Sequence, residues 1–191
     1  MTAIDISVFT QRISDRQLEQ LCADNPEVKF ETTPTGRLIV MSPTGSESGK
    51  LNMSLAAQIW NWNAKTKLGV VFDSSTGFKL SNGATRSPDV SWVQSVKWNS
   101  LSKQQQRKFA PIDPDFVIEL LSPTDDLLEL QQKMMEYMQC GVKLGWLINP
   151  EDKQVEIYRC DRDKEILDNP QSLSGENVLP KLTLDLAEIF N

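Results

Sequence analysis

Histidine is absent from this chain of 191 residues. A protein without imidazole cannot build a Ser-His-Asp or Cys-His catalytic site, and it cannot bind zinc through histidine. Any catalysis must therefore come from carboxylates, lysine, tyrosine, serine or cysteine, or from a hard metal ion held by oxygen ligands.

Cysteines and long apolar runs are also scarce. The three cysteines, Cys22, Cys140 and Cys160, are widely spaced and form no Cys-x-x-Cys pair. This pattern favours neither a disulfide framework nor a cysteine-rich zinc site, and it predicts a reducing, cytoplasmic setting. No segment approaches the roughly 18 apolar residues of a membrane-spanning helix, and the N-terminus lacks the features of a signal peptide. We therefore expect a cytoplasmic protein without membrane contact.

The net charge of −6 hides an uneven distribution along the chain. Residues 50–108 contain nine Lys and Arg against two Asp, a local charge of +7, while the rest of the chain is strongly acidic. A basic face for a polyanion explains this split, and so does an ordinary surface whose charges mix on folding. Spacing alone leaves both interpretations open.

Helical and extended patterns alternate through the chain without a repeat or a linker. A single domain is expected, with a helical extension over 1–27, a core over 28–160, and strands and a helix over 161–191. Within it the pattern predicts a hairpin at 28–41, a helix at 46–67, a strand pair at 70–73 and 77–80, strands at 89–93 and 116–121, a helix at 125–140, a strand pair at 143–148 and 155–159, and a last helix near 184–190. This order indicates a mixed α/β fold.

Glu119 is the one charge in the apolar run Phe116–Leu121. A carboxylate in a central strand is costly unless it is paired, protonated or bound to a metal. Asp89 follows Pro88 at the entry of another strand, where its side chain can face a cleft. Two carboxylates on neighbouring strands would form a site for Mg²⁺. Each also has a structural explanation, as a strand-end residue or as half of a buried ion pair.

Three further residues are candidates for supporting roles. Lys133 and Tyr137 stand four residues apart and therefore share one face of the predicted helix. Glu47 opens the first long helix, where the helix dipole favours a carboxylate and where it could also complete an acidic site. Taken singly, each is better explained as a surface or core residue. Any tryptophan that is exposed could stack on a base, although most of the five should be core.

Four segments together resemble the Uma-two family of restriction-endonuclease-like bacterial proteins, within the PD-(D/E)xK nuclease superfamily. They are GRLIVMSPTGSESGKLN (36–52), SPDVSWV (87–93), PDFVIELLSPTDD (114–126) and KMMEYMQCGVKLGWLINP (133–150). The resemblance implies a central mixed sheet flanked by helices, and Mg²⁺-dependent phosphodiester cleavage as the ancestral activity.

The resemblance also implies roles for individual residues. Asp89 matches the Asp of the PD motif, and Glu119 matches the acidic residue of the (D/E)xK strand. The lysine position of that strand is Leu121, so Lys133 on the next helix is the expected replacement. The Lys133–Tyr137 spacing is similar to a Gln-x-x-x-Tyr helix motif of related nucleases, and Glu47 matches a first-helix acidic residue.

The leading hypothesis is a DNA endonuclease that uses Mg²⁺, with Mn²⁺ as a possible substitute. Asp89, Glu119 and the carbonyl of Leu120 would bind the metal, Lys133 would act on water or phosphate, and Tyr137 and Glu47 would support them. The resemblance also implies a homodimer, since dimers are frequent in the superfamily and cutting both strands favours two active sites. The alternatives are an inactive nuclease-fold module that binds nucleic acid or protein, and a carboxylate-based hydrolase of another substrate.

Overall fold

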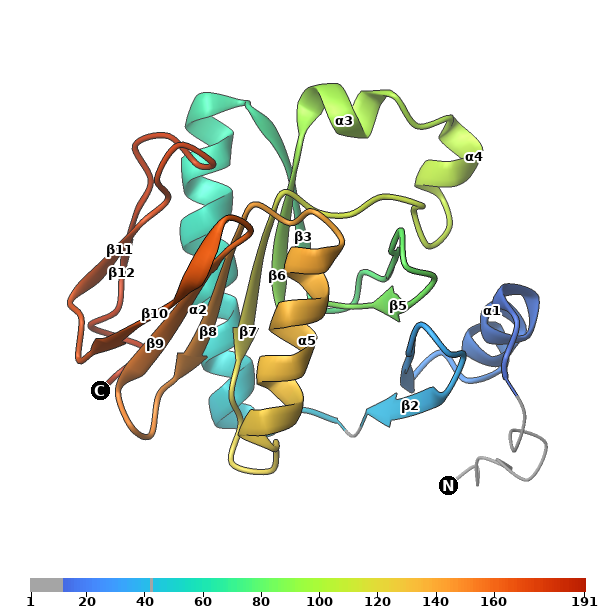
Figure 1. Ribbon diagram of the computed structural model, residues 1–191, viewed down its shortest axis with the longest axis horizontal. Helices are drawn as coiled ribbons and strands as arrows, with labels where there is room; N and C mark the ends of the chain where they lie inside the picture. The colour runs from blue at the N-terminus through green and yellow to red at the C-terminus, as the bar shows by residue number, and fades with distance from the viewer. Residues whose placement is uncertain (1–11, 42) are drawn as a thin grey trace.

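The computed structural model describes residues 12–41 and 43–191, and a six-stranded mixed sheet forms its centre (Figure 1). The strands follow the order β10-β9-β8-β7-β6-β3, with β7 and β8 parallel and the other neighbours antiparallel. Their bounds are β3 Gly69–Asp73, β6 Val90–Gln94, β7 Phe116–Leu120, β8 Leu144–Asn149, β9 Gln154–Arg159 and β10 Arg162–Asp168.

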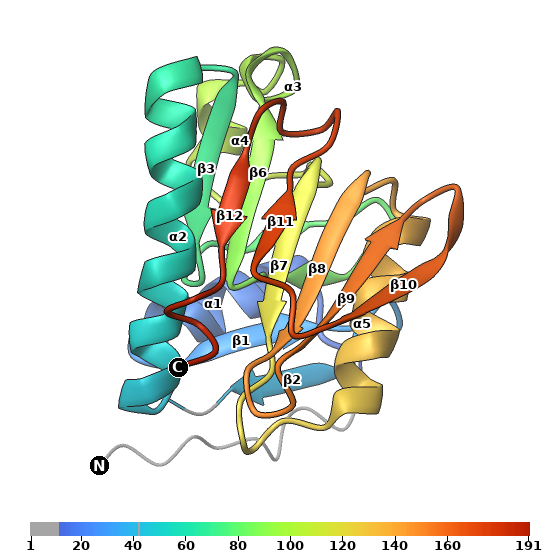
Figure 2. The ribbon, with the colours of Figure 1, turned by 90° about the vertical axis from the view of Figure 1, so that its left-hand side faces the viewer.

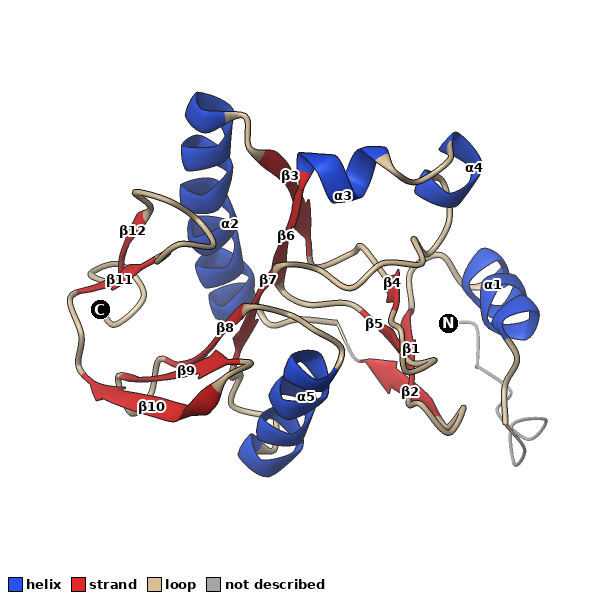
Figure 3. Ribbon diagram, turned by 45° about the horizontal axis from the view of Figure 1, so that its top comes forward, coloured by secondary structure: helices blue, strands red, loops and turns tan. Residues whose placement is uncertain are grey.

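Two long helices, α2 (Ser46–Thr66) and α5 (Leu127–Gln139), cover opposite faces of this sheet (Figure 3). α2 buries a stripe at helical spacing, formed by Leu51, Leu55, Ile59 and Trp62. α5 begins at Asp126, whose side chain accepts hydrogen bonds from two backbone N–H groups of the first turn. It ends before Gly141, which adopts a φ of +90° that favours glycine. The first and last residues of both helices lie within two positions of the predicted ones.

β7 and β8 lie in the middle of the sheet, and every residue of both strands is buried. Side chains alternate between the two faces of a strand. Phe116, Ile118 and Leu120 pack in the apolar cluster that includes α2, whereas Val117 packs in the cluster that includes α5. Glu119 shares the face of Val117, so its side chain is directed toward α5.

A smaller four-stranded sheet lies beside one end of the central sheet, in the order β2-β1-β5-β4. It comprises β1 Lys29–Thr32, β2 Leu38–Met41, β4 Phe78–Lys79 and β5 Thr85–Arg86. α1 (Asp15–Asp24) packs near it and starts with a capping box between Ser14 and Gln17. Ser87, Pro88 and Asp89 connect β5 directly to β6, so the small sheet adjoins the position of Asp89. Two short helices, α3 (Ser95–Asn99) and α4 (Lys103–Gln106), follow β6.

One predicted strand pairing and one predicted helix are wrong. Residues 70–73 and 77–80 do not pair with each other, because β3 pairs with β6 and β4 pairs with β5. The Asp73 carboxylate accepts a hydrogen bond from the Ser75 N–H at 3.0 Å, and this turn leads the chain away from β3.

The helix predicted near 184–190 is also absent from the described part of the chain. Thr183–Asp185 forms β12, which pairs with β11 (Ser172–Ser174). Leu184 and Leu186 are buried on either side of exposed Asp185, a period of two that fits a strand. Only a turn follows, in which Ile189 and Phe190 donate to the carbonyl of Leu186.

The predicted class, a mixed α and β fold with a central sheet flanked by helices, is confirmed. The expected N-terminal extension contains α1, while residues 1–11 lie outside the described part. Among the described residues, no helix combines the length and apolar character needed to cross a bilayer.

Candidate active site

Asp89 links three elements at the end of the central sheet. Its Oδ2 accepts a hydrogen bond from the backbone N–H of Leu120 on β7 at 2.9 Å, and its Oδ1 accepts one from the side-chain amide of Asn52 on α2 at 3.1 Å. Burial raises the pKa of Asp89 above its ordinary value, although the Leu120 N–H and the nearby charge of Lys133 oppose the rise.

Glu119 lies beside Asp89 on the neighbouring strand and is 4% exposed. Its Oε1 accepts a hydrogen bond from the hydroxyl of Tyr137 at 2.8 Å and lies 2.9 Å from the ammonium of Lys133. Burial raises the pKa of Glu119 to about 7, and the charges of Asp89 and Glu31 add to the rise against the opposing effect of Lys133. The carboxyl group can therefore exchange a proton near neutral pH.

Lys133 and Tyr137 reach Glu119 from one face of α5, as their spacing predicts. Burial would lower the pKa of Lys133, but the attraction of Glu119 and Glu31 outweighs it and raises the pKa above its ordinary value. Lys133 is therefore a buried, fully charged ammonium. Burial, followed by the charge of Glu119, raises the pKa of the Tyr137 hydroxyl, so this group stays neutral and donates a proton to the hydrogen bond.

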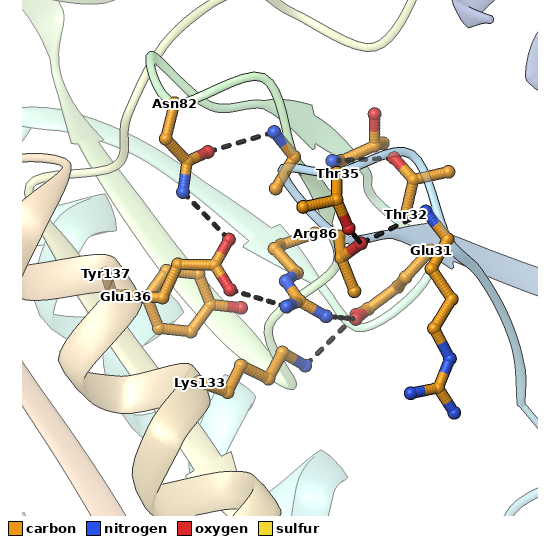
Figure 4. A network of polar contacts seen from close by, with 12 residues as sticks. Glu31, Thr32, Thr35, Asn82, Arg86, Lys133, Glu136 and Tyr137 are labelled. Carbon is orange, nitrogen blue, oxygen red and sulfur yellow. Dashed lines mark hydrogen bonds and ion pairs between the residues drawn. The ribbon is translucent and has the colours of Figure 1, made fainter. Parts of the chain in front are cut away.

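Glu31 on β1 is a member of the site that the sequence did not suggest (Figure 4). Its Oε1 lies 3.0 Å from the Lys133 ammonium and accepts a hydrogen bond from the Ser87 N–H at 2.9 Å. Its Oε2 lies 3.1 Å from the Arg86 guanidinium. Burial would raise the pKa of Glu31, but Lys133, Arg86 and the Ser87 N–H together lower it. Glu31 thus remains ionised and is the second carboxylate in contact with the Lys133 ammonium, beside Glu119.

Arg86 extends the network back to α5. Figure 4 shows its guanidinium between Glu31 on β1 and Glu136 on α5. Glu136 in turn accepts a hydrogen bond from the side-chain amide of Asn82 at 3.0 Å. The small sheet and α5 are therefore joined by alternating negative and positive side chains, with Lys133 at the end nearest Glu119.

Asn52 is the second member that sequence reasoning missed. It donates to Asp89, while its own Oδ1 is buried and accepts no hydrogen bond from the described protein atoms. A buried amide oxygen without a donor is unfavourable, and it is also a suitable ligand for a hard cation or for water bound to one.

Glu47, by contrast, is exposed on the first turn of α2, and no described hydrogen bond or ion pair connects it with these residues. Its supporting role stays a prediction. The acidic position that the structure brings next to Lys133 is instead Glu31.

The cluster carries excess negative charge when all its groups are ionised. Among the groups joined directly by hydrogen bonds and ion pairs, the four carboxylates of Glu31, Asp89, Glu119 and Glu136 outnumber the two cations, Lys133 and Arg86, and the charge of Lys29 also acts on Asp89. Buried net charge is costly, and a divalent cation would offset it. The described residues contain no group of three or more Asp, Glu or Cys side chains spaced to hold a metal. Two carboxylates and an amide oxygen nevertheless suit Mg²⁺, which keeps several of its water ligands.

The mixed sheet, with Asp89 and Glu119 on adjacent strands and Lys133 directed at Glu119, has the arrangement that the sequence resemblance implies. The family model Uma2, described as "Putative restriction endonuclease", matches residues 15–187. The chain therefore belongs to the Uma2 family, as the four sequence segments indicate.

A solved structure has the same fold. It is described as a "putative nuclease belonging to DUF820" from Anabaena variabilis ATCC 29413, and it superposes with a TM-score of 0.71 at 20% identity over 84% of this chain and 89% of that chain. A comparison with curated proteins gave no match.

Proposed function

We propose that this protein is a Mg²⁺-dependent endonuclease that hydrolyses phosphodiester bonds in DNA, with Mn²⁺ able to replace Mg²⁺. The observation that carries the proposal is the arrangement around Glu119. A buried carboxylate with a raised pKa lies beside a second carboxylate and a charged lysine, in a cluster with net negative charge. Such groups cluster at catalytic sites. Family membership and fold support the same reaction class.

Asp89, Glu119 and the backbone carbonyl of Leu120 would hold the metal ion, and the buried oxygen of Asn52 would serve it directly or through water. When bound, Mg²⁺ polarises the phosphate and lowers the pKa of a coordinated water molecule. The excess negative charge of the cluster favours the binding of a divalent cation over the binding of a monovalent one. The hydrogen bond from Leu120 to Asp89 fixes the spacing between the two carboxylates.

Lys133 would act through its charge. Because its pKa is raised, the ammonium keeps its proton at neutral pH and cannot take one from water. It is suited instead to stabilise the negative charge that develops on the phosphate and to orient the attacking water. Glu31 is a positioning residue for Lys133, because it forms a second ion pair with the ammonium besides that of Glu119. Tyr137 fixes the position of the Glu119 carboxylate through its hydrogen bond. Glu47, in the first turn of α2, would give further support.

A second candidate function is a nuclease-fold module that binds nucleic acid or protein without cutting it. The observation in its favour is Leu121, which stands where the strand motif has lysine. A homodimer would place two active sites on a duplex. We therefore expect a homodimer if the protein is an endonuclease, whereas the binding function does not require one.

Plasmid nicking in Mg²⁺ and in Mn²⁺ separates the two functions. Wild-type protein is expected to convert supercoiled plasmid to nicked and linear forms, while Asp89→Ala and Glu119→Ala are expected to be inactive with folded circular-dichroism spectra. Glu156→Gln is the matched control, since Glu156 is a buried strand glutamate that contacts Tyr158 and Lys164 instead of the site. Equal nicking by wild type and the Glu119 variant would contradict the proposed site.

A further inference from the structure

A shallow apolar groove with a volume of about 660 Å³ runs between α2 and the edge strand β3. Met53 and Trp60 line it from α2, and Phe72, Asp73 and Thr76 line it from β3 and the following turn. Trp60 is 60% exposed, whereas Trp62, two residues later, is 8% exposed and packs in the core. An exposed indole in a groove is therefore available to a ligand.

The groove leads to the candidate active site. Met53 directly follows Asn52, whose amide donates to Asp89. On the other wall, Asp73 pairs with Val90, the residue after Asp89. Figure 2 shows β3 beside part of α2. The end of the groove that Met53 and Asp73 line is therefore the end toward Asp89.

Among the described residues, five cations of the basic stretch form no ion pair, and three of them belong to α2 or its C-terminal cap, while Lys103 and Arg107 belong to α4 and its C-terminal cap. Within residues 50–108, Lys79, Arg86, Lys97 and Lys108 each form an ion pair with a carboxylate. Lys50 and Lys65 on α2, and Lys67 at its C-terminal cap, are exposed and form no ion pair with the described residues. Three of these five unpaired cations therefore belong to the helix that lines the groove, which favours a polyanion as its ligand.

We propose that this groove binds an unpaired DNA strand, with a base stacked on Trp60, phosphates near the α2 lysines, and the chain directed toward Asp89 and Glu119. The inference deepens the proposed endonuclease function and rests on it. An indole stacks only on a base whose face is free, and the base faces of a duplex are covered by their neighbours. A second copy of the chain is disfavoured as the occupant, because a symmetric contact would bring two sets of like-charged lysines together.

Fluorescence anisotropy of a labelled oligothymidylate of about twelve nucleotides tests the inference. The titrations are made in EDTA at low salt, so that binding is measured without metal-dependent cleavage. Trp60→Ala is expected to weaken single-strand binding about tenfold or more, the loss typical of one stacked base, and Trp60→Phe is expected to retain most of the affinity. Leu128→Ala is the control, because Leu128 is equally exposed but lies on α5.

A blunt duplex and two lysine variants complete the test. Trp60→Ala is expected to leave duplex binding unchanged. Lys50→Gln should reduce the salt dependence of single-strand binding, whereas Lys108→Gln, which removes a cation already paired with Glu19, should not.

Unchanged single-strand affinity in Trp60→Ala, or an equal loss of affinity for the duplex, would overturn the inference. A shift of Trp60→Ala from dimer to monomer in sedimentation, with oligonucleotide binding intact, would show that a second copy occupies the groove. Failure of the nuclease proposal would appear separately, as absence of plasmid nicking.

Discussion

Replacing Glu119 with Gln should flatten the dependence of stability on pH between pH 5 and 8. Burial raises the pKa of Glu119 from 4.5 to about 7, so the folded protein binds the proton more tightly than the unfolded chain does. Stability then falls as pH rises through this interval, and it levels off above the folded-state pKa. One pKa unit corresponds to about 1.4 kcal/mol, so the shift is equivalent to about 3 kcal/mol in the free energy of unfolding.

Other groups of the cluster do not cancel this effect. The pKa of Asp89 is also raised by burial, so its titration adds to the fall in stability. The lowered pKa of Glu31 gives a stability that is lost only as pH falls below the ordinary glutamate value, which lies outside the interval. Glu119→Gln should therefore remove most, but not all, of the slope.

Urea unfolding at several pH values between 5 and 8, in EDTA, measures this slope. Wild type should lose about 3 kcal/mol across the interval, Glu119→Gln should lose much less, and Glu156→Gln should follow wild type. Added Mg²⁺ should stabilise wild type more at pH 8 than at pH 6, because metal and proton compete for the same carboxylates. A wild-type slope that survives in Glu119→Gln would refute the assignment of the raised pKa to Glu119.

Three further variants test individual contacts. Glu31→Gln removes one of the two carboxylates around Lys133 and should slow plasmid nicking roughly 10- to 100-fold with a displaced pH–rate profile, while Mn²⁺ affinity measured by calorimetry is retained. An unchanged rate and profile would limit Glu31 to a structural role. Lys133→Met keeps the volume and removes the charge, so nicking should fall at least about 100-fold, and activity close to wild type would exclude Lys133 from the reaction. Tyr137→Phe deletes a hydrogen bond worth about 1 kcal/mol, so nicking should fall no more than about tenfold; complete inactivity would show a larger role for the hydroxyl.

The sequence predicts the central sheet and its two long helices well, because their patterns are strong and local. Phe116–Leu120 has apolar residues on both faces, and α2 and α5 have clear stripes and termini. Lys133 and Tyr137 meet the Glu119 carboxylate because Glu119 lies in a strand and the two other residues lie in the helix that comes next in the chain. The sequence pattern predicts the wrong pairing for β3 and β4, because a turn residue such as Asp73 does not determine with which strand a short strand pairs.

Glu31 and Asn52 could not be found from the sequence alone. Glu31 lies in a four-residue strand two positions after Lys29, a pattern typical of a solvated hairpin. It contacts Lys133, more than 100 positions away, only after the small sheet has packed on α5. Asn52 lies in α2 beside Leu51 of the core stripe, and a single amide in a long helix gives no sign that it will reach Asp89. The sequence pattern and the resemblance indicate Glu47 instead, five residues earlier on the same helix.

Calorimetric titration of Mg²⁺ and Mn²⁺ into wild type and into the Asp89→Ala/Glu119→Ala double variant tests the central claim most directly. The account predicts saturable binding of one ion by wild type, tighter at pH 8 than at pH 6, and no binding by the double variant, with nicking by the same wild-type sample. Absence of binding in wild type, or equal binding by the double variant, would contradict a metal-dependent nuclease site at Asp89 and Glu119.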